Sequence, residues 1–216
     1  MKTENSTQHQ SVKWKTTALT VLAFATLGSS PAFADPFTFD LVRSPALKTF
    51  TNFVPNAHGQ VTVTPKGPVE QMDVTITGLP PNTDFDFFVI QTALAPFGLS
   101  WYQGDIETDG SGSGSATFIG RFNIETFIVA PGVVNNTTIV FKNTKNPQFS
   151  DINFNPPTQP VHQWHLGLWF NSPKDAFAAG GPNTETPFNG GHNAGVQVLN
   201  TSNFPSGAGP LSRVKP

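Results

Sequence analysis

The chain contains no cysteine. It therefore has no disulfide, no thiol chemistry, no thiolate ligand for a blue-copper centre and no lipid anchor on an N-terminal cysteine. Basic charge is also scarce: with Lys2, Lys13, Lys15 and Glu4 of the leader set aside, nine Lys and Arg remain against thirteen Asp and Glu, a net charge of −4. Because no basic patch stands out, we expect neither a nucleic acid nor an anionic membrane surface as a partner.

Long apolar runs are missing as well. The run from Thr16 to Gly28 is shorter than the roughly 20 residues that a membrane-spanning helix needs. It follows basic residues and precedes Ala32-Phe33-Ala34, the order of a cleavable secretion signal. A membrane anchor or buried helix is disfavoured, because Pro31 interrupts the segment. We therefore expect residues 1–34 to be removed, the mature chain to start at Asp35, and the protein to be secreted or periplasmic, with no membrane attachment after cleavage.

Residues 35–216 fit a single domain with a tail at 205–216 that contains Pro and Gly. Apolar and polar residues alternate repeatedly, as in QMDVTITGL, which is typical of strands with one buried face. Turn-forming residues separate these runs at short intervals, which favours an antiparallel two-sheet β-sandwich, Ig-like or jelly-roll-like. The expected strands lie near 59–65, 70–78, 83–92, 99–108, 115–124, 125–130, 137–143, 161–170 and 194–200.

Only one helix is expected, near 173–179, with Ser172 as its N-cap, Pro173 in its first turn and Gly180 after its end. Residues 144–160 contain four prolines and no steady period, and so predict a long loop. Twenty Phe in the chain indicate an aromatic core. The expected core residues are Met72, Val74, Ile76, Phe85, Phe87, Val89, Phe118, Phe122, Leu166 and Leu168.

The segment Gly78 to Val89, GLPPNTDFDFFV, resembles the corner between two strands of fibronectin type III domains. A Leu, a turn with Pro and an aromatic residue precede an alternating strand in both. Phe85 stands where that family usually has a tyrosine whose hydroxyl bonds to the corner backbone. The resemblance covers about a dozen residues and implies a sandwich, without any functional residue.

Two carboxylates, Asp105 and Glu107, are two residues apart on a predicted strand and should share a face, with Asp109 at the following turn. Such a group suits a Ca²⁺ site or a glycosidase acid/base pair. The alternative is a solvent-exposed face that leads into a hairpin, since residues 109–114 have turn composition. The strict alternation of Ser and Gly over 110–115 gives no nucleophile-elbow spacing, and we predict no catalytic residues.

Aromatic residues suggest a second kind of site, since Trp and Tyr rings stack on sugar faces while amides bond hydroxyls. Trp101, Tyr102, His165 and Trp169 are the predicted ligand-binding residues. In VHQWHLGLWF a regular strand places His165 and Trp169 on one face, with Gly167 leaving a gap between them for a ligand. The alternative is that these rings belong to the core.

The function that remains is a non-enzymatic exported module that binds a carbohydrate or another cell-surface ligand. A structural component of a surface layer is not distinguished from it. The alternative is an extracellular metal-binding protein or metalloenzyme that uses His162, His165 and His192. His162 and His165 are three apart and need a bulge to converge on one metal. The sequence names no cofactor.

Overall fold

The computed structural model describes residues 35–98, 100–122, 125–126, 160–161, 163–187 and 193–214. The expected leader, the predicted strand at 137–143 and nearly all of the predicted loop at 144–160 lie outside these residues. The chain divides into two units, residues 1–32 and 33–216, and all the described residues belong to the second.

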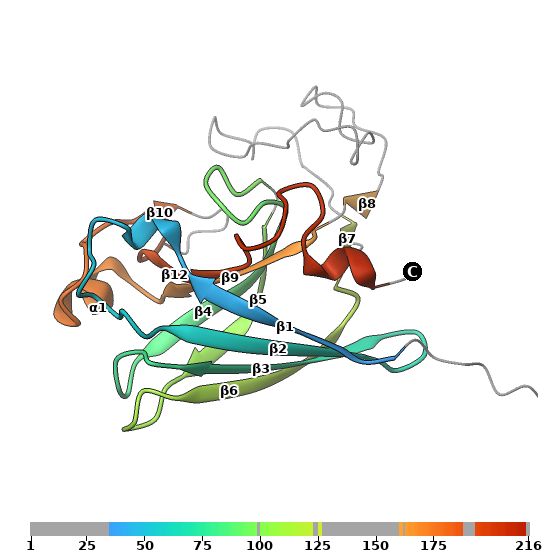
Figure 1. Cartoon of the computed structure of the whole chain (residues 1–216), viewed down its shortest axis with the longest axis horizontal. Coiled ribbons are helices and arrows are strands. Elements are labelled where there is room, and N and C mark those ends of the chain that lie inside the picture. The colour runs from blue at the N-terminus through green and yellow to red at the C-terminus, as the bar shows by residue number, and fades with distance from the viewer. Residues whose placement is uncertain are drawn as a thin grey trace, which may run out of the picture. The chain divides into compact units, whose positions relative to one another are not determined.

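The described part of the chain is mostly β-structure, built around one eight-stranded antiparallel sheet (Figure 1). Its strand order is β5-β4-β9-β12-β1-β2-β3-β6. Two short strand pairs, β7 with β8 and β10 with β11, accompany it. The strands are β1 (Phe37–Arg43), β2 (His58–Pro65), β3 (Glu70–Thr77), β4 (Asp84–Ile90), β5 (Ser100–Glu107), β6 (Gly114–Gly120), β7 (Glu125–Thr126), β8 (Pro160–Val161), β9 (His165–Phe170), β10 (Thr186–Pro187), β11 (Asn193–Ala194) and β12 (Gln197–Asn200).

The sheet is continuous because β1 changes partner along its length. Residues 37–41 pair with β2, and Val42 and Arg43 pair with β12. At the other end of the order, the hairpin at residues 108–113 brings the edge strands β5 and β6 together. The prediction of an all-β antiparallel fold is confirmed. The division into two separate sheets is not confirmed, because the sheet runs through β1 and nearly closes on itself like a barrel.

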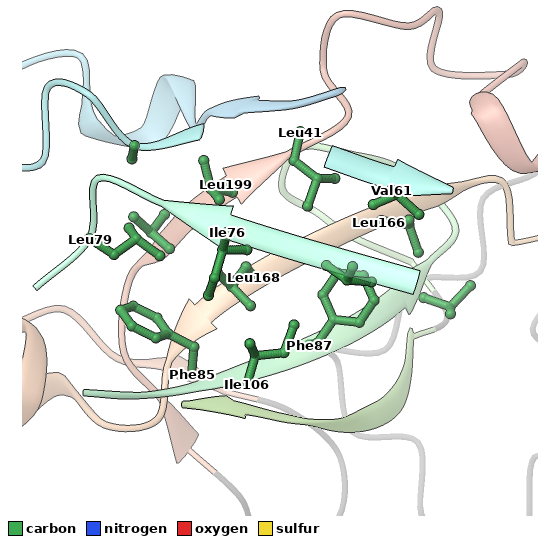
Figure 2. Packing of buried hydrophobic residues seen from close by; sticks show 14 of the residues in the cluster. Leu41, Val61, Ile76, Leu79, Phe85, Phe87, Ile106, Leu166, Leu168 and Leu199 are labelled. Carbon is green, nitrogen blue, oxygen red and sulfur yellow. The ribbon is translucent and has the colours of Figure 1, made fainter. Parts of the chain in front are cut away.

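The core lies inside this curved sheet and is rich in phenylalanine. Nine of the ten predicted core residues are buried, and Phe118 is partly buried at the edge strand β6, where its ring stacks on Phe87 at 5.5 Å. Phe85 and Phe170 pack against each other from neighbouring strands, with ring centroids 4.8 Å apart. Figure 2 shows side chains from strands far apart in the sequence, among them Ile76 and Leu168, gathered in this interior.

The corner that precedes β4 is fixed by a hydroxyl from another strand end. Phe85 is fully buried and has no hydroxyl to offer. Thr108, just after β5, supplies one: its Oγ1 donates to the carbonyl of Pro80 at 2.6 Å and accepts from the amide of Thr83 at 3.0 Å. The corner is therefore held by hydrogen bonds between a side chain and the backbone, although Phe85 cannot make them.

The helix α1 (Pro173–Ala178) begins and ends as the sequence predicts. Ser172 Oγ accepts from the amide of Asp175 at 3.2 Å and donates to its Oδ2 at 2.6 Å, which satisfies the first turn. Short 3₁₀ turns, η1 (Pro45–Leu47) and η2 (Pro210–Arg213), cover the core, and Leu211 of the expected tail is fully buried. Within the described ranges, no helix is long and apolar enough to cross a membrane.

Replacement of Phe87 by Ala is expected to cost about 3–5 kcal/mol of unfolding free energy, because it leaves a cavity under the sheet and removes the stacked contact with Phe118. Urea unfolding of Phe87→Ala against the parent measures this. The matched control is Ile119→Ala on β6, whose side chain is 59% exposed and should change stability by less than about 0.5 kcal/mol. Equal effects of the two changes would contradict the described core.

Candidate functional site

His165, a predicted ligand-binding and metal-ligating residue, is fully buried. Its Nε2 lies 3.0 Å from the carbonyl of Ser206 and its Nδ1 lies 2.8 Å from Thr201 Oγ1. Because a carbonyl only accepts, Nε2 carries the proton and Nδ1 accepts from the threonine hydroxyl. Both nitrogens are therefore engaged inside the fold. Burial lowers the pKa of the imidazole, so the ring is neutral at neutral pH.

The other two histidines of the predicted metal set, His162 and His192, lie outside the described residues. Among the residues that the structure does describe, no group of three His, Asp or Glu side chains is placed to hold a metal ion. The metal site is thus a prediction that gains no support from the geometry of His165.

Trp169 fills the space that the sequence analysis assigned to a ligand. A Cβ at Gly167 would clash with the six-membered ring of the Trp169 indole, so the gap beside this glycine is occupied by the protein itself. The indole is fully buried and packs edge-on against Phe88 at 5.4 Å and Phe97 at 5.0 Å. The expected surface centred on His165 and Trp169 is therefore not exposed. The two residues do share one face of β9, as predicted, but the chain covers that face.

Residues 91–98 cover Trp169, on which Phe97 packs, and a buried polar network holds this segment in place. The side chains of Gln197 and Asn200 both donate to the carbonyl of Ala93 at 3.2 Å. Gln197 Oε1 in turn accepts from Asn200 at 2.7 Å and from the Ser44 hydroxyl at 2.8 Å. Because these polar groups satisfy one another, the cover is part of the fixed structure.

Trp101 and Tyr102 are both exposed, each to 47%, so they meet the first requirement for contact with a ligand. They are neighbours on β5, however, and pair with Val89 and Phe88. Val89 lies in the interior core and Phe88 belongs to the second cluster outside the sheet. The two rings therefore point to opposite faces of the strand and do not make one platform.

A β-bulge in β5 defines which side chains accompany Tyr102. Gly104 pairs with Phe87 and Tyr102 pairs with Phe88, so Gln103 is an extra residue. The bulge places Tyr102 and Asp105, three apart in the sequence, on the same outer face, where the tyrosine hydroxyl donates to Asp105 Oδ1. Burial, followed by this bond and the nearby carboxylates, raises the pKa of Tyr102 above its usual range.

Four carboxylates lie on this outer face. Asp105 and Glu107 share it, as the sequence predicts, and they stand opposite Asp86 and Asp84 of β4 in the register. We use the name β4–β5 outer face for this side of the two strands, which carries Asp84, Asp86, Phe88, Tyr102, Asp105 and Glu107. On it Tyr102, Asp105 and Glu107 are exposed, whereas Asp86 and Phe88 are buried. Burial raises the pKa of Asp84, and the negative charges of Asp105 and Glu107 raise it further.

The sequence analysis missed the two carboxylates of β4. The signal was present, because Asp84 and Asp86 alternate with Phe85 and Phe87. Asp109, by contrast, belongs to the hairpin turn. Its Oδ1 accepts from the Ser111 hydroxyl at 2.6 Å and from the amides of Ser113 at 3.1 Å and Ser111 at 2.8 Å, and these bonds lower its pKa.

The β4–β5 outer face combines an exposed ring with several hydrogen-bond acceptors. The Tyr102 ring rests edge-on against Phe88 at 5.5 Å, and its hydroxyl is held by Asp105. A ring fixed in this way loses little freedom when a ligand stacks on it. Carboxylates accept strong hydrogen bonds from hydroxyl and ammonium groups. The arrangement is suited to binding a polar ligand that has an apolar face.

The double change His165→Ala and Trp169→Ala is expected to lower the thermal midpoint by many degrees, because truncation of a buried Trp alone costs about 3–5 kcal/mol. Differential scanning calorimetry measures it. Trp101→Ala, which removes a half-exposed indole from β5, is the control and should have a much smaller effect. An unchanged midpoint in the double variant would restore the interpretation of these two residues as a ligand surface.

The lowered pKa of His165 predicts a loss of stability in acid. The unfolded chain takes up a proton near pH 6.5, whereas the folded protein takes it up only at a lower pH. The contribution of His165 to stability should therefore be constant above about pH 6.5 and fall as the pH drops below it, by at most about 1.4 kcal/mol per pH unit. Urea titrations between about pH 5 and 7.5 test this. The slope should flatten in His165→Gln, and an identical slope in both proteins would contradict it.

In comparisons with known proteins, no protein-family model and no curated protein matches the chain.

Proposed function

We propose that residues 35–216 form an exported, non-enzymatic module that binds a glycan on the β4–β5 outer face, with the Tyr102 ring as the stacking platform. The observation that carries the proposal is the placement of this ring. It is 47% exposed, packs against Phe88, is held at its hydroxyl by Asp105, and shares its face of β5 with the exposed carboxylates of Asp105 and Glu107. We also propose that the sheet belongs to the Ig-like or jelly-roll-like sandwiches.

Glycan recognition requires both parts of this surface. The C–H face of a sugar ring is apolar and stacks on an aromatic side chain, while its hydroxyls donate to acceptors at the rim. Tyr102 supplies the first kind of contact, and Asp105 and Glu107, both exposed, supply the second. Because these groups lie on hydrogen-bonded strands, the surface is organised before the ligand arrives.

The proposal assigns the ligand to fewer residues than the sequence predicted. Trp101 faces the other side of β5. His165 is buried and bonded to Thr201 and Ser206, and Trp169 is buried against Phe97, so Tyr102 alone of the predicted set lies on the proposed surface. Export remains part of the proposal and is supported by the leader-like composition of residues 1–34. Within the part of the chain that the structure describes, no group of side chains favours the metal-dependent alternative.

The test is a glycan array followed by calorimetry on any glycan that the mature protein binds. Tyr102→Ala is expected to weaken binding by about tenfold or more, because a stacked aromatic side chain contributes roughly 1.5–3 kcal/mol. Tyr102→Phe should retain most of the affinity, because the ring stays and only its bond to Asp105 is lost.

Ile119→Ala serves as the control, since it removes an exposed apolar side chain from β6 and leaves β4 and β5 untouched. The proposal fails if no glycan binds to the parent protein, or if Tyr102→Ala binds as tightly as the parent.

A further inference from the structure

The strand β6 lies at one end of the strand order, so one of its edges is open. On the other edge all seven residues, Gly114–Gly120, pair with β3 without a shift in register. The hairpin joins β6 to β5 at one end, but within the described part of the chain no ladder forms between these two strands. Figure 1 shows β6 at the lower margin of the sheet, with no strand beyond it. An open edge presents backbone N–H and C=O groups to which another strand can bond.

The two end strands of the sheet differ in how their edges are protected. Proteins protect an open edge with a bulge, a proline or charged side chains. The strand β5 has two of these features, the bulge at Gln103 and the exposed carboxylates of Asp105 and Glu107. The strand β6 has none of them, because its sequence GSATFIG contains no charge and no proline and its ladder with β3 is regular. The edge of β6 therefore remains available to another strand.

This edge is also apolar and held in place. Ile119 is 59% exposed, more than any other large apolar side chain on a described strand. On the inner side, the ring of Phe118 stacks on Phe87 at 5.5 Å. On the outer side, the Thr117 hydroxyl donates to Asp73 at 2.7 Å. Because the strand is fixed from both sides, it loses little conformational freedom when a second strand bonds to it.

We propose that β6 pairs antiparallel with β6 of a second copy of the chain, about a two-fold axis through Thr117. A two-fold axis perpendicular to the strands brings the same edge of two copies together in antiparallel orientation. With the axis at Thr117, the seven residues of each strand overlap completely, and Ile119 of each copy lies opposite Ser115 of the other. The inference concerns a surface separate from the β4–β5 outer face and does not rest on the proposed function.

Charge at the two ends of β6 favours a second copy as the partner. Arg121 follows the strand, and Asp109 lies in the turn that precedes it; both are exposed, and neither forms an ion pair within the described residues. Arg121 interacts with Glu70 only beyond ion-pair distance. In the proposed pairing, Arg121 lies opposite Ser113 of the second copy, whose amide donates to Asp109 at 3.1 Å. A positive charge therefore meets a negative one at both ends of the interface.

The same charges disfavour other pairings. A basic peptide would be attracted to the exposed Asp105 and Glu107 of β5 and gain nothing from the uncharged β6. Pairing of β5 with its own copy would bring four carboxylates together, and like charges in opposed positions destabilise a sheet. Of the two end strands, β6 is thus the one that can meet its own copy without repulsion.

The absence of cysteine makes the pairing directly testable. In the mature protein, Thr117→Cys introduces a single thiol, and the two copies of this position face each other across the axis with Cβ atoms about 5 Å apart. Mild oxidation is expected to link most of the protein into disulfide-bonded dimers. Thr75→Cys is the matched control, because it places an exposed thiol on β3, where the two copies would lie about 14 Å apart and should not crosslink.

Sedimentation equilibrium of the parent protein measures the association without any thiol. Two seven-residue strands make a small interface, so the dissociation constant should be on the order of 10–100 µM. Arg121→Glu places two acidic side chains beside Asp109 and is expected to raise this constant about tenfold. Lys66→Glu makes the same change of charge at an exposed position between β2 and β3 and should alter the constant by less than about twofold.

The pairing is wrong if the parent protein stays monomeric at the highest concentration, or if Thr75→Cys crosslinks as readily as Thr117→Cys. A dimer that Arg121→Glu and Lys66→Glu weaken equally uses another surface and also overturns the inference. Glycan binding through Tyr102 is measured separately, so its presence or absence leaves these outcomes unchanged.

Discussion

The change of partner along β1 is the constraint on which the rest of the fold depends. Residues 37–41 bond to β2, the next two residues bond to β12, and the amide of Ser44 continues the ladder to the carbonyl of Val198 at 2.8 Å. Arg43 stabilises this point, because its guanidinium donates to the carbonyls of Leu47, Phe50 and Phe53. A strand that bonds to both halves makes one sheet and one interior, so the domain needs no disulfide to hold the halves together.

The strands β4 and β9 are buried on both faces, apart from Asp84 at the start of β4. The interior face of β4 carries Phe85 and Phe87, while Phe88 on its other face packs under Tyr102 and against Trp169. Strands covered on both sides read as nearly continuous apolar runs, and alternation then no longer separates core from solvent. For this reason, a polar residue on the outer face of β9 did not indicate exposure to solvent. His165 looks like a surface residue in the sequence, but it is neutral and bonded within the fold.

The parts of the fold that could be predicted from the sequence are those formed by residues close together along the chain. The hairpin of β2 and β3 could be predicted, because Val74 and Ile76 alternate with polar residues and a turn joins the two strands. The helix α1 could be predicted because its capping residues lie next to it in the sequence. The strand β1 was missed although Phe37, Phe39 and Leu41 alternate, and with it the continuity of the sheet. The placement of β9 between β4 and β12, and hence the cover over Trp169, depends on partners distant in sequence, and no short-range pattern encodes it.

The sequence predicted that Tyr102 and Asp105 could contact a ligand, but it did not predict that they lie on the same face. The reason is one glycine. On a regular strand, Tyr102 and Asp105 face opposite sides. The bulge that unites them requires Gly104, whose φ of +149° is rarely adopted by other residues. The same glycine lets β6 approach, since a Cβ there would come within 2.9 Å of the Phe118 ring. Closure of the sheet and assembly of the β4–β5 outer face thus depend on the same position, so the geometry of the proposed surface is maintained by the packing that completes the core.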